Sequence, residues 1–393
     1  MQTEQLQTHP LPTHQLQTQW ITSSEEFLAL RDEWNELLIN SRCNTIFLTW
    51  EWQYTWWMNL AEGRSLVILT VRDGNQLVAL APMSLRPADY SRLVPFRVLE
   101  MLGAGSVGSD YLSIIVRSDD EGRALTELCM SMIARKFVIE MNNTDRASTI
   151  MTKAALRMRD LGCRTARYTQ NFCPYIDLSG YTWNTYITRP GTSNGVRYHK
   201  KLRKLNRTFN VSLSRAMTEQ GSSRDLEVLI NLHLKRWNDK GGSNAFDSNE
   251  LRNFHFAFSH VAFQKDWLRL YILRLDDAPA AAVYGFYYMN TFYYYQAGFD
   301  PQFSQYSVGQ LSVGLTIEQA IAEGATEYDL LHGEEEYKYE WANNERELVC
   351  LSIYPPNLQG ALCSQMMEIR KGVKTLILSR APAGLRDRMY TTS

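Results

Sequence analysis

The spacing of apolar residues along the chain predicts a protein of mixed helices and strands. Apolar positions three and four residues apart indicate a helix that begins after Ser23, with Glu26 placed to complete a capping box. The segment TWEWQYTWWMNL indicates a second helix, because Trp50, Tyr54 and Trp57 fall on one helical face. That spacing favours packing in the core over stacking on sugar rings.

Strand-like runs follow these two helices. SLVILTVRD and QLVALAPMSLR are joined by Asp73-Gly74-Asn75, which is typical of a hairpin turn. FRVLEML, DYLSIIV and KFVIEMNNT indicate further strands, and residues 121–134 and 148–162 indicate helices, the second closed by Gly162. The first half is therefore predicted to be an α/β unit with antiparallel strand pairs.

The second half, which starts near Thr188, repeats this order of elements. It has helices at 195–209, at about 225–238 and up to Phe263, then three strands, a helix at 309–322 and two more strands. No repeat of individual residues accompanies the repeated order. We expect two similar α/β units in tandem, residues 20–187 and 188–393, the second ending in a terminal helix and the first preceded by a disordered leader, residues 1–19.

Composition limits the partners and the compartment. The 393 residues include 41 Lys and Arg and 42 Asp and Glu, so the net charge of −1 gives no whole-chain field to attract nucleic acid. The six cysteines form no CxxC pair and the histidines no HExxH motif, so we expect free thiols in a reducing compartment and no metal site. Since neither a signal peptide nor a membrane span is recognisable, we expect a soluble, cytoplasmic protein.

Residues 103–108 fit the pattern GxGxxG but lack its context. A dinucleotide-binding fingerprint opens a helix, whereas the residues that follow, SDYLSIIV, have the pattern of a strand. We interpret the segment as a glycine-rich turn.

The helix at 195–209 is the strongest local charge feature. Six basic residues lie within 11 positions, with no acid among them, and at 100° per residue they span an arc of about 160°. They are Arg197, Lys200, Lys201, Arg203, Lys204 and Arg207. A solvated face is the simpler reading, but the lack of acids favours anion binding: CoA phosphates, a nucleotide-linked or lipid-linked sugar, or tRNA. Such binding would weaken with salt.

Several segments, in this order and spacing, resemble a known family: FLTWEWQYTWW, SDYLSIIV, RYHKKLRKLNR, HLKRWNDKGG and YDLLHGEEEYKYEWA. They are similar to tandem GNAT-fold proteins, the BioF2-like acetyltransferases of the CelD/BcsL type. These are associated with cellulose and exopolysaccharide synthesis and are distant relatives of the FemABX peptidyltransferases. The resemblance implies an α/β fold of two tandem GNAT-like (acyl-CoA N-acyltransferase) domains that share a cleft.

The resemblance also implies a place for the acyl donor, which would be acetyl-CoA or another acyl-CoA. GNAT enzymes hold its pyrophosphate in a loop before a helix, with the pattern Gln/Arg-x-x-Gly-x-Gly/Ala. The corresponding residues here are Gln305, Tyr306, Ser307, Val308 and Gly309, with the glycine one position late. An ordinary helix cap at Ser307 is the alternative interpretation.

Catalytic candidates follow from two further motifs. The segment from His332 to Lys338 resembles a Gly-acid-x-x-Tyr-Lys signature, in which Lys338, next to Tyr337, would stabilise the oxyanion of acyl transfer. Glu334 or Glu336 would serve as base, unless this is simply a solvated acidic loop. In Ser109-Asp110-Tyr111, Asp110 would orient a sugar hydroxyl of the acceptor, or would only cap a loop. Arg236 is a weaker polar candidate.

The expected function is transfer of an acyl group, with acetyl as the first expectation, from a CoA thioester to an amine or hydroxyl of a sugar or polysaccharide precursor. Direct attack needs no covalent enzyme intermediate. Two alternatives stay open: a Fem-like aminoacyltransferase that uses aminoacyl-tRNA on a cell-wall precursor, and a non-catalytic subunit of a polysaccharide synthesis complex. Peripheral membrane association and the oligomeric state also stay open.

Overall fold

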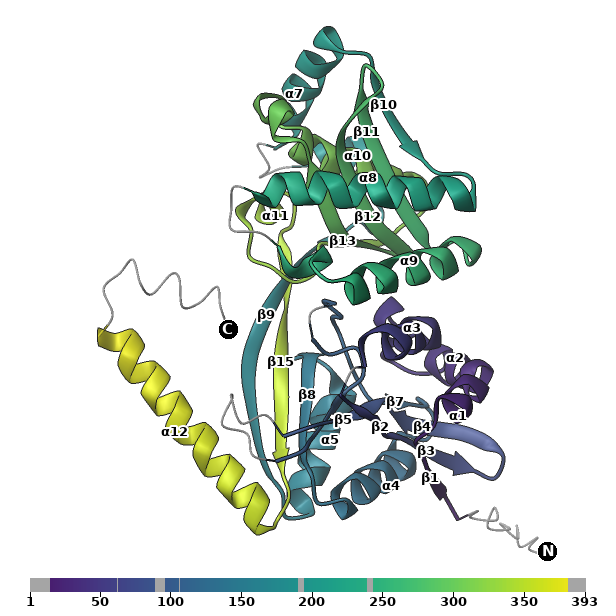
Figure 1. The fold of residues 1–393 in the computed structure, drawn as a ribbon, viewed down its shortest axis with the longest axis vertical. Coiled ribbons are helices and arrows are strands. Elements are labelled where there is room, and N and C mark those ends of the chain that lie inside the picture. The colour runs from purple at the N-terminus through teal and green to yellow at the C-terminus, as the bar shows by residue number, and fades with distance from the viewer. Residues whose placement is uncertain are drawn as a thin grey trace, which may run out of the picture.

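The computed structural model describes residues 15–61, 63–88, 96–105, 107–189, 194–238 and 243–380. It has two α/β units that lie one above the other along the long axis (Figure 1). The elements of the first unit are β1 (Gln17–Ile21), α1 (Ser24–Ala29), α2 (Arg31–Ile39), α3 (Trp50–Leu60), β2 (Ser65–Leu66), β3 (Ile68–Asp73), β4 (Gln76–Ala81), β5 (Met83–Arg86), β6 (Val98–Met101), β7 (Ile115–Val116), α4 (Glu121–Ala134), β8 (Val138–Asp145), α5 (Thr149–Asp160) and β9 (Arg164–Asp177).

The second unit begins after the short helix α6 (Trp183–Ile187). Its elements are α7 (Asn194–Thr208), β10 (Val211–Arg215), α8 (Glu219–Asn238), α9 (Asn249–Gln264), β11 (Leu268–Leu275), β12 (Ala278–Tyr288), β13 (Thr291–Phe299), the 3-10 helix η3 (Pro301–Tyr306), α10 (Val308–Ala322), β14 (Glu327–Asp329), α11 (Glu336–Tyr339), β15 (Asn344–Tyr354) and α12 (Leu358–Arg380). The two units therefore share an order of elements, and each contains one parallel strand pair, β6 with β8 and β13 with β14.

One sheet runs through both units. Its strand order is β10-β11-β12-β13-β14-β9-β15-β8-β6-β5-β2, and a smaller sheet, β1-β3-β4-β7, covers the first unit. The last strand of the chain, β15, lies between β8 and β9 of the first unit. Figure 1 shows β9 and β15 as long neighbouring strands that connect the lower lobe with the upper one. The C-terminal strand thus completes the N-terminal unit.

Aromatic side chains fill the core between α3, α9 and the sheets. Trp52 and Trp56 of α3 are buried, and Trp52 meets Phe254 and Phe258 of α9 edge to face. The prediction that α3 packs in the core is confirmed, but the predicted face was wrong in part, because Tyr54 and Trp57 are only half-buried. The hairpin between β3 and β4 and the capping box at Ser23 are confirmed as well.

Two expectations need correction. Residues 17–19 of the predicted leader are ordered, because β1 begins at Gln17 and pairs with β3; residues 1–14 lie outside the described part of the chain. The strand predicted for SDYLSIIV is reduced to β7, two residues long, and residues 109–114 form a buried irregular loop. The polar residues of this loop make contacts between the two units instead of pairing in a sheet.

Candidate active site

A cavity opens in the second unit where two parallel strands separate. β13 and β14 pair only over Thr291–Tyr293 and Glu327–Asp329, and beyond these residues the strands diverge. Residues on both sides of the gap, together with α8 and α11, enclose about 210 Å³. Its polar or charged lining side chains are those of His233, Arg236, Trp237, Ser243, Tyr294, Tyr295, Gln296, His332, Glu335, Tyr337 and Lys338.

In the first unit the loop after β6 occupies part of the corresponding space. β6 and β8 also pair over three residues, Val98–Glu100 with Val138–Glu140. The loop after β6 then folds back against the end of β8, where Leu112 N–H donates to Asn143 O (3.0 Å) and Asn143 Nδ2 donates to Ser109 O (2.9 Å). This loop then crosses to the second unit, and a separate cavity of about 340 Å³ borders Tyr111–Ser113 and the start of α5.

Residues 107–111, the crossing loop, are held from both sides. Trp52 Nε1 of the first unit donates to Ser109 Oγ (2.8 Å), and the Tyr295 hydroxyl of the second unit donates to Val107 O. Gly108 has a φ of +67°, and a Cβ at this position would lie 3.0 Å from Cε1 of His332. A larger residue at 108 would therefore be strained and would press on the His332 ring.

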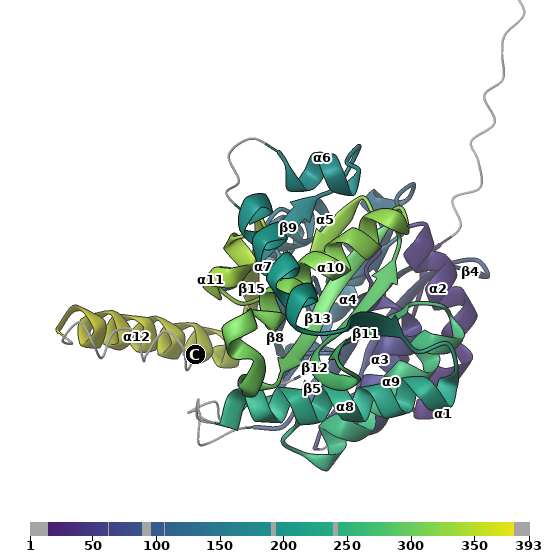
Figure 2. The same ribbon diagram turned by 90° about the horizontal axis from the view of Figure 1, so that it is seen from above.

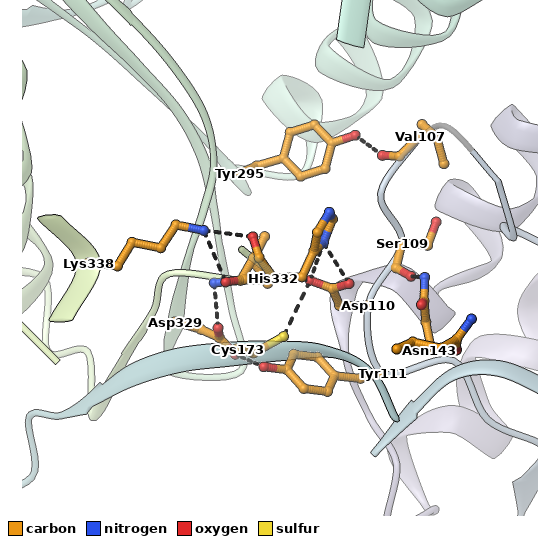
Figure 3. A network of polar contacts seen from close by, with 12 residues as sticks. Val107, Ser109, Asp110, Tyr111, Asn143, Cys173, Tyr295, Asp329, His332 and Lys338 are labelled. Carbon is orange, nitrogen blue, oxygen red and sulfur yellow. Dashed lines mark hydrogen bonds and ion pairs between the residues drawn. The ribbon is translucent and has the colours of Figure 1, made fainter. Parts of the chain in front are cut away.

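The crossing loop delivers Asp110 to His332 (Figure 3). The Asp110 side chain is fully buried, and its Oδ1 lies 2.9 Å from His332 Nδ1. Asp110 Oδ2 also accepts the His332 backbone N–H (2.9 Å). We assign the Nδ1 proton to the hydrogen bond with the carboxylate, which leaves Nε2 with a free lone pair. The charge of Asp110, opposed by burial, raises the pKa of His332.

A second buried carboxyl lies beneath this pair. Asp329 Oδ2 accepts the Tyr111 hydroxyl (2.6 Å), and Oδ1 accepts the Leu331 N–H (2.8 Å). Burial, and then the neighbouring charge of Glu327, raise the pKa of Asp329 to about 7. Since Tyr111 and Leu331 adjoin Asp110 and His332 in sequence, these bonds fix the backbone of both partners of the ion pair.

Lys338 is buried at the cavity wall, and its ammonium group is saturated with acceptors. Nζ donates to His332 O (2.6 Å) and Leu331 O (3.2 Å) and forms an ion pair with Glu335 Oε2 (3.0 Å). Although burial acts in the opposite direction, Lys338 lowers the pKa of Glu335. In this conformation Lys338 holds the turn that carries His332 and adds positive charge to the cavity, but it keeps no proton for an oxyanion.

Arg236 of α8 adds an unpaired donor. Its Nε is buried without a hydrogen-bond partner, and no ion pair of Arg236 occurs among the described residues. The guanidinium lies 5.5 Å from the centre of the Phe299 ring and 5.8 Å from that of Tyr337. Arg236 is a cation between aromatic rings at a cavity, and its Nε–H is available to donate. Such a group could bind a negatively charged group of a ligand.

The predicted donor loop and the basic helix are neighbours. Ser307 adopts a left-handed conformation (φ 55°) ahead of α10. Lys204 Nζ of α7 lies 5.3 Å from the centre of the Tyr306 ring, and Lys201 Nζ donates to Gln310 Oε1 of α10. Among the described residues, none of the six cations of α7 forms an ion pair. The positive face is therefore unneutralised and borders the loop of Gln305, Val308 and Gly309.

The structure separates the remaining sequence candidates. Tyr337 lines the cavity, whereas Glu334 and Glu336 are exposed and do not line it; the glutamate at the cavity is Glu335. Asp110 cannot contact a sugar hydroxyl in this conformation, because its carboxyl group is fully buried against His332. Arg197 and Lys200 are exposed on α7.

Sequence reasoning missed His332 as a functional residue. Its partner Asp110 is 222 positions away, and no spacing rule connects the two. The sequence indicated only that both residues belong to segments that resemble the GNAT-fold family, SDY and HGEEEYK.

Comparison with known proteins supports this description. Residues 196–339 match the family model described as an acetyltransferase (GNAT) domain. The second unit thus contains a segment that matches a GNAT acetyltransferase domain, and the match indicates an acyltransferase. No curated protein matches the sequence.

Solved structures share the whole two-unit arrangement. A crystal structure of FemX superposes with a TM-score of 0.59 at 10% identity, covering 89% of this chain and 99% of that one. The C-terminal domain of a putative lysylphosphatidylglycerol synthetase from Agrobacterium fabrum gives a TM-score of 0.52 at 8% identity, covering 88% and 95%. An L-PGS from Bacillus licheniformis gives 0.50 at 9% identity, covering 86% and 95%. At such identities the likeness concerns the fold: two GNAT-like units in tandem.

Proposed function

We propose that this protein transfers an acyl group from a CoA thioester to an amine or hydroxyl, with His332 as general base. The observation that carries the proposal is the hydrogen bond from His332 to the buried carboxylate of Asp110, at a cavity between separated parallel strands. A histidine held in one tautomer by a carboxylate presents Nε2 as a proton acceptor. In a GNAT acetyltransferase domain, that acceptor serves the attacking group.

The proposed reaction is a direct transfer. His332 Nε2 removes the proton as the acceptor's nitrogen or oxygen attacks the thioester carbonyl. The tetrahedral intermediate collapses, the C–S bond breaks, and the proton is returned to the CoA thiolate. Beyond Tyr293, β13 stays paired with β12 but has no strand on its β14 side, so backbone N–H groups on that side would be available to the oxyanion. Lys338 and Arg236 add positive potential to the same space.

The donor would lie between α7 and the start of α10. The loop of Gln305, Tyr306 and Ser307, with the first N–H groups of α10 at Val308 and Gly309, would bind the pyrophosphate. Lys201 and Lys204, with Arg197 and Lys200 further along α7, would neutralise the phosphates. Acetyl-CoA is the donor to test first, because the matched family model is that of an acetyltransferase domain.

The acceptor would approach from the side of the first unit, since Gly108 forms one wall of the cavity. A sugar or polysaccharide precursor, in a CelD/BcsL-type role in cellulose or exopolysaccharide synthesis, is our proposal for its class. It rests on the sequence resemblance alone. An aminoacyl-tRNA donor is the second candidate, favoured by the unneutralised face of α7 and by the FemX-like fold.

The test combines donor binding with turnover. We expect acetyl-CoA to bind in calorimetry, and Gly309→Glu, which adds a negative charge beside Phe299, to abolish binding. We expect His332→Gln to bind acetyl-CoA normally but to lose about a hundredfold to ten-thousandfold in the rate of CoA release with amine acceptors. The matched control is His260→Gln, an exposed histidine of α9. Full activity of His332→Gln would refute the base assignment, and no binding of acetyl-CoA would move the donor to aminoacyl-tRNA.

A further inference from the structure

The terminal helix α12 carries an apolar stripe that the rest of the described protein leaves uncovered. Leu358, Leu362, Met366 and Ile369 are 84%, 50%, 37% and 67% exposed. At 100° per residue these four positions fall within about 80° of one another around the helix. They therefore form one continuous apolar stripe.

A different side of the same helix, about 120° away around its axis, attaches it to the protein. Cys363 is buried in a small cluster with Val138 of β8 and Tyr354 of β15, and Met367 packs against that cluster. In both ribbon views α12 stands out to the side of the rest of the protein (Figures 1 and 2). The candidate active site has no part in this surface. An exposed apolar stripe on a helix fixed from behind indicates a partner on the outer side.

The charge of the adjoining sequence identifies the kind of partner. Residues 370–393 contain six Lys and Arg and a single Asp, while the whole chain has a net charge of −1. Two copies of this tail brought together along the stripe would repel each other. An anionic surface would attract the tail while the stripe is buried in its apolar layer.

We propose that α12 binds the surface of an anionic lipid bilayer through Leu358, Leu362, Met366 and Ile369. The helix lies in the interface and does not span it, since none of the described helices is long and apolar enough to cross a membrane. This inference goes beyond the proposed acyl transfer and does not depend on it.

The test is co-sedimentation of the full-length protein with vesicles of phosphatidylcholine, with or without phosphatidylglycerol. We expect binding to the mixed vesicles, a decrease at high salt, and little binding to phosphatidylcholine alone. The double variant Leu362→Glu, Ile369→Glu should reduce partitioning about tenfold or more, because each glutamate replaces apolar area that enters the bilayer. Met130→Glu is the matched control, since Met130 of α4 is 49% exposed, as Leu362 is.

Three results would overturn the proposal. They are undiminished binding by the double variant, binding that neither anionic lipid nor salt affects, and a dimer in light scattering that the double variant converts to a monomer. The last result would assign the stripe to a second copy. Circular dichroism of each variant ensures that lost binding is not lost folding, and acetyl-CoA titration of the double variant keeps this test separate from that of the proposed function.

Discussion

His332 and Asp110 come from different units, and each depends on its own supports. Asp110 sits in the crossing loop, which Trp52, Asn143 and Tyr295 hold in place. His332 follows β14, in a turn whose carbonyl groups accept from Lys338. The orientation of His332, the proposed base, therefore depends on how the two units pack against each other.

The pH dependence of the reaction tests this pair. Asp110 raises the pKa of His332, and only the neutral imidazole accepts a proton, so activity should rise with pH through an apparent pKa above the ordinary histidine value of 6.5. In Asp110→Asn this rise in activity, the acid limb of the pH profile, should move to lower pH, because the neutral amide no longer favours the imidazolium. The maximal rate should fall about tenfold to a hundredfold as the orientation of His332 is lost.

The measurement is the pH profile of kcat/KM for both proteins, with thermal unfolding to establish that Asp110→Asn is folded. A purely structural Asp110 would lower the amplitude of the profile without moving its limb. An unmoved limb would therefore contradict the assignment.

Lys338 offers a separate prediction at the scale of one residue. Lys338→Met keeps much of the buried stem but removes an ammonium group with three acceptors. We expect a loss of about 1–3 kcal/mol in the free energy of unfolding, since two buried carbonyl groups lose their donor. Urea unfolding gives this value. If Lys338 acted only on the oxyanion, stability would stay unchanged and only kcat would fall.

The site itself was only partly predictable from sequence. Lys338 and Tyr337, which line the cavity, were predicted because they lie in a contiguous motif. The loop of Gln305 to Gly309 does not line the cavity, and its role as donor site stays a prediction. The pairing of Asp110 with His332 depends on where a loop of one unit meets a turn of the other, and this is a tertiary relation that no local pattern encodes. Glu335 was missed in favour of Glu334 and Glu336 because sequence alone does not say which of three successive acids pairs with Lys338 at the cavity.

At the scale of elements, the basic helix is the feature that charge patterning predicted best. α7 spans Asn194–Thr208, close to the predicted 195–209, and its buried stripe includes Tyr198 and Leu205. The contact with η3 and α10 could not be foreseen, because it depends on packing between helices distant in sequence. It places Lys201 and Lys204 beside the predicted donor loop.

Charge reversal on α7 tests that placement. Lys204→Glu should weaken acetyl-CoA binding about tenfold or more, because a cation beside Tyr306 is replaced by an anion where phosphates are expected. Arg203→Glu is the control, since it makes the same charge change one position away, where the side chain is exposed and donates to His199 O of its own helix. Titration calorimetry at two salt concentrations gives both affinities. Equal weakening by both variants would mean a general field effect and no phosphate contact at Lys204.

At the scale of the whole molecule, the repeated order of elements predicted two units. The units are not separate bodies joined by a linker, because one sheet runs through both. β15 arises from the second unit and pairs over its length with β9, and over Leu348–Ile353 with β8. Hydrophobic periodicity predicted β15 as a strand but could not say which neighbours it joins, since strand pairing is set by long-range contacts. The predicted boundary between residues 187 and 188 remains a description of sequence order.

Because β15 lies between two strands of the first unit, a substitution that destabilises β15 should also destabilise the first unit. Leu351 of β15 is 2% exposed and lies opposite both Arg167 of β9 and Met141 of β8. Leu351→Pro removes a ladder hydrogen bond from a central strand, at a cost of about 3 kcal/mol or more. Hydrogen exchange should accelerate in β8 and β9, more than 170 positions earlier in sequence, as well as in β15.

The control is Val211→Pro in the edge strand β10, where we expect faster exchange only in β10 and β11. If Leu351→Pro left β8 and β9 protected, each unit would be stable by itself, and the Asp110–His332 pair would join two independently folded bodies.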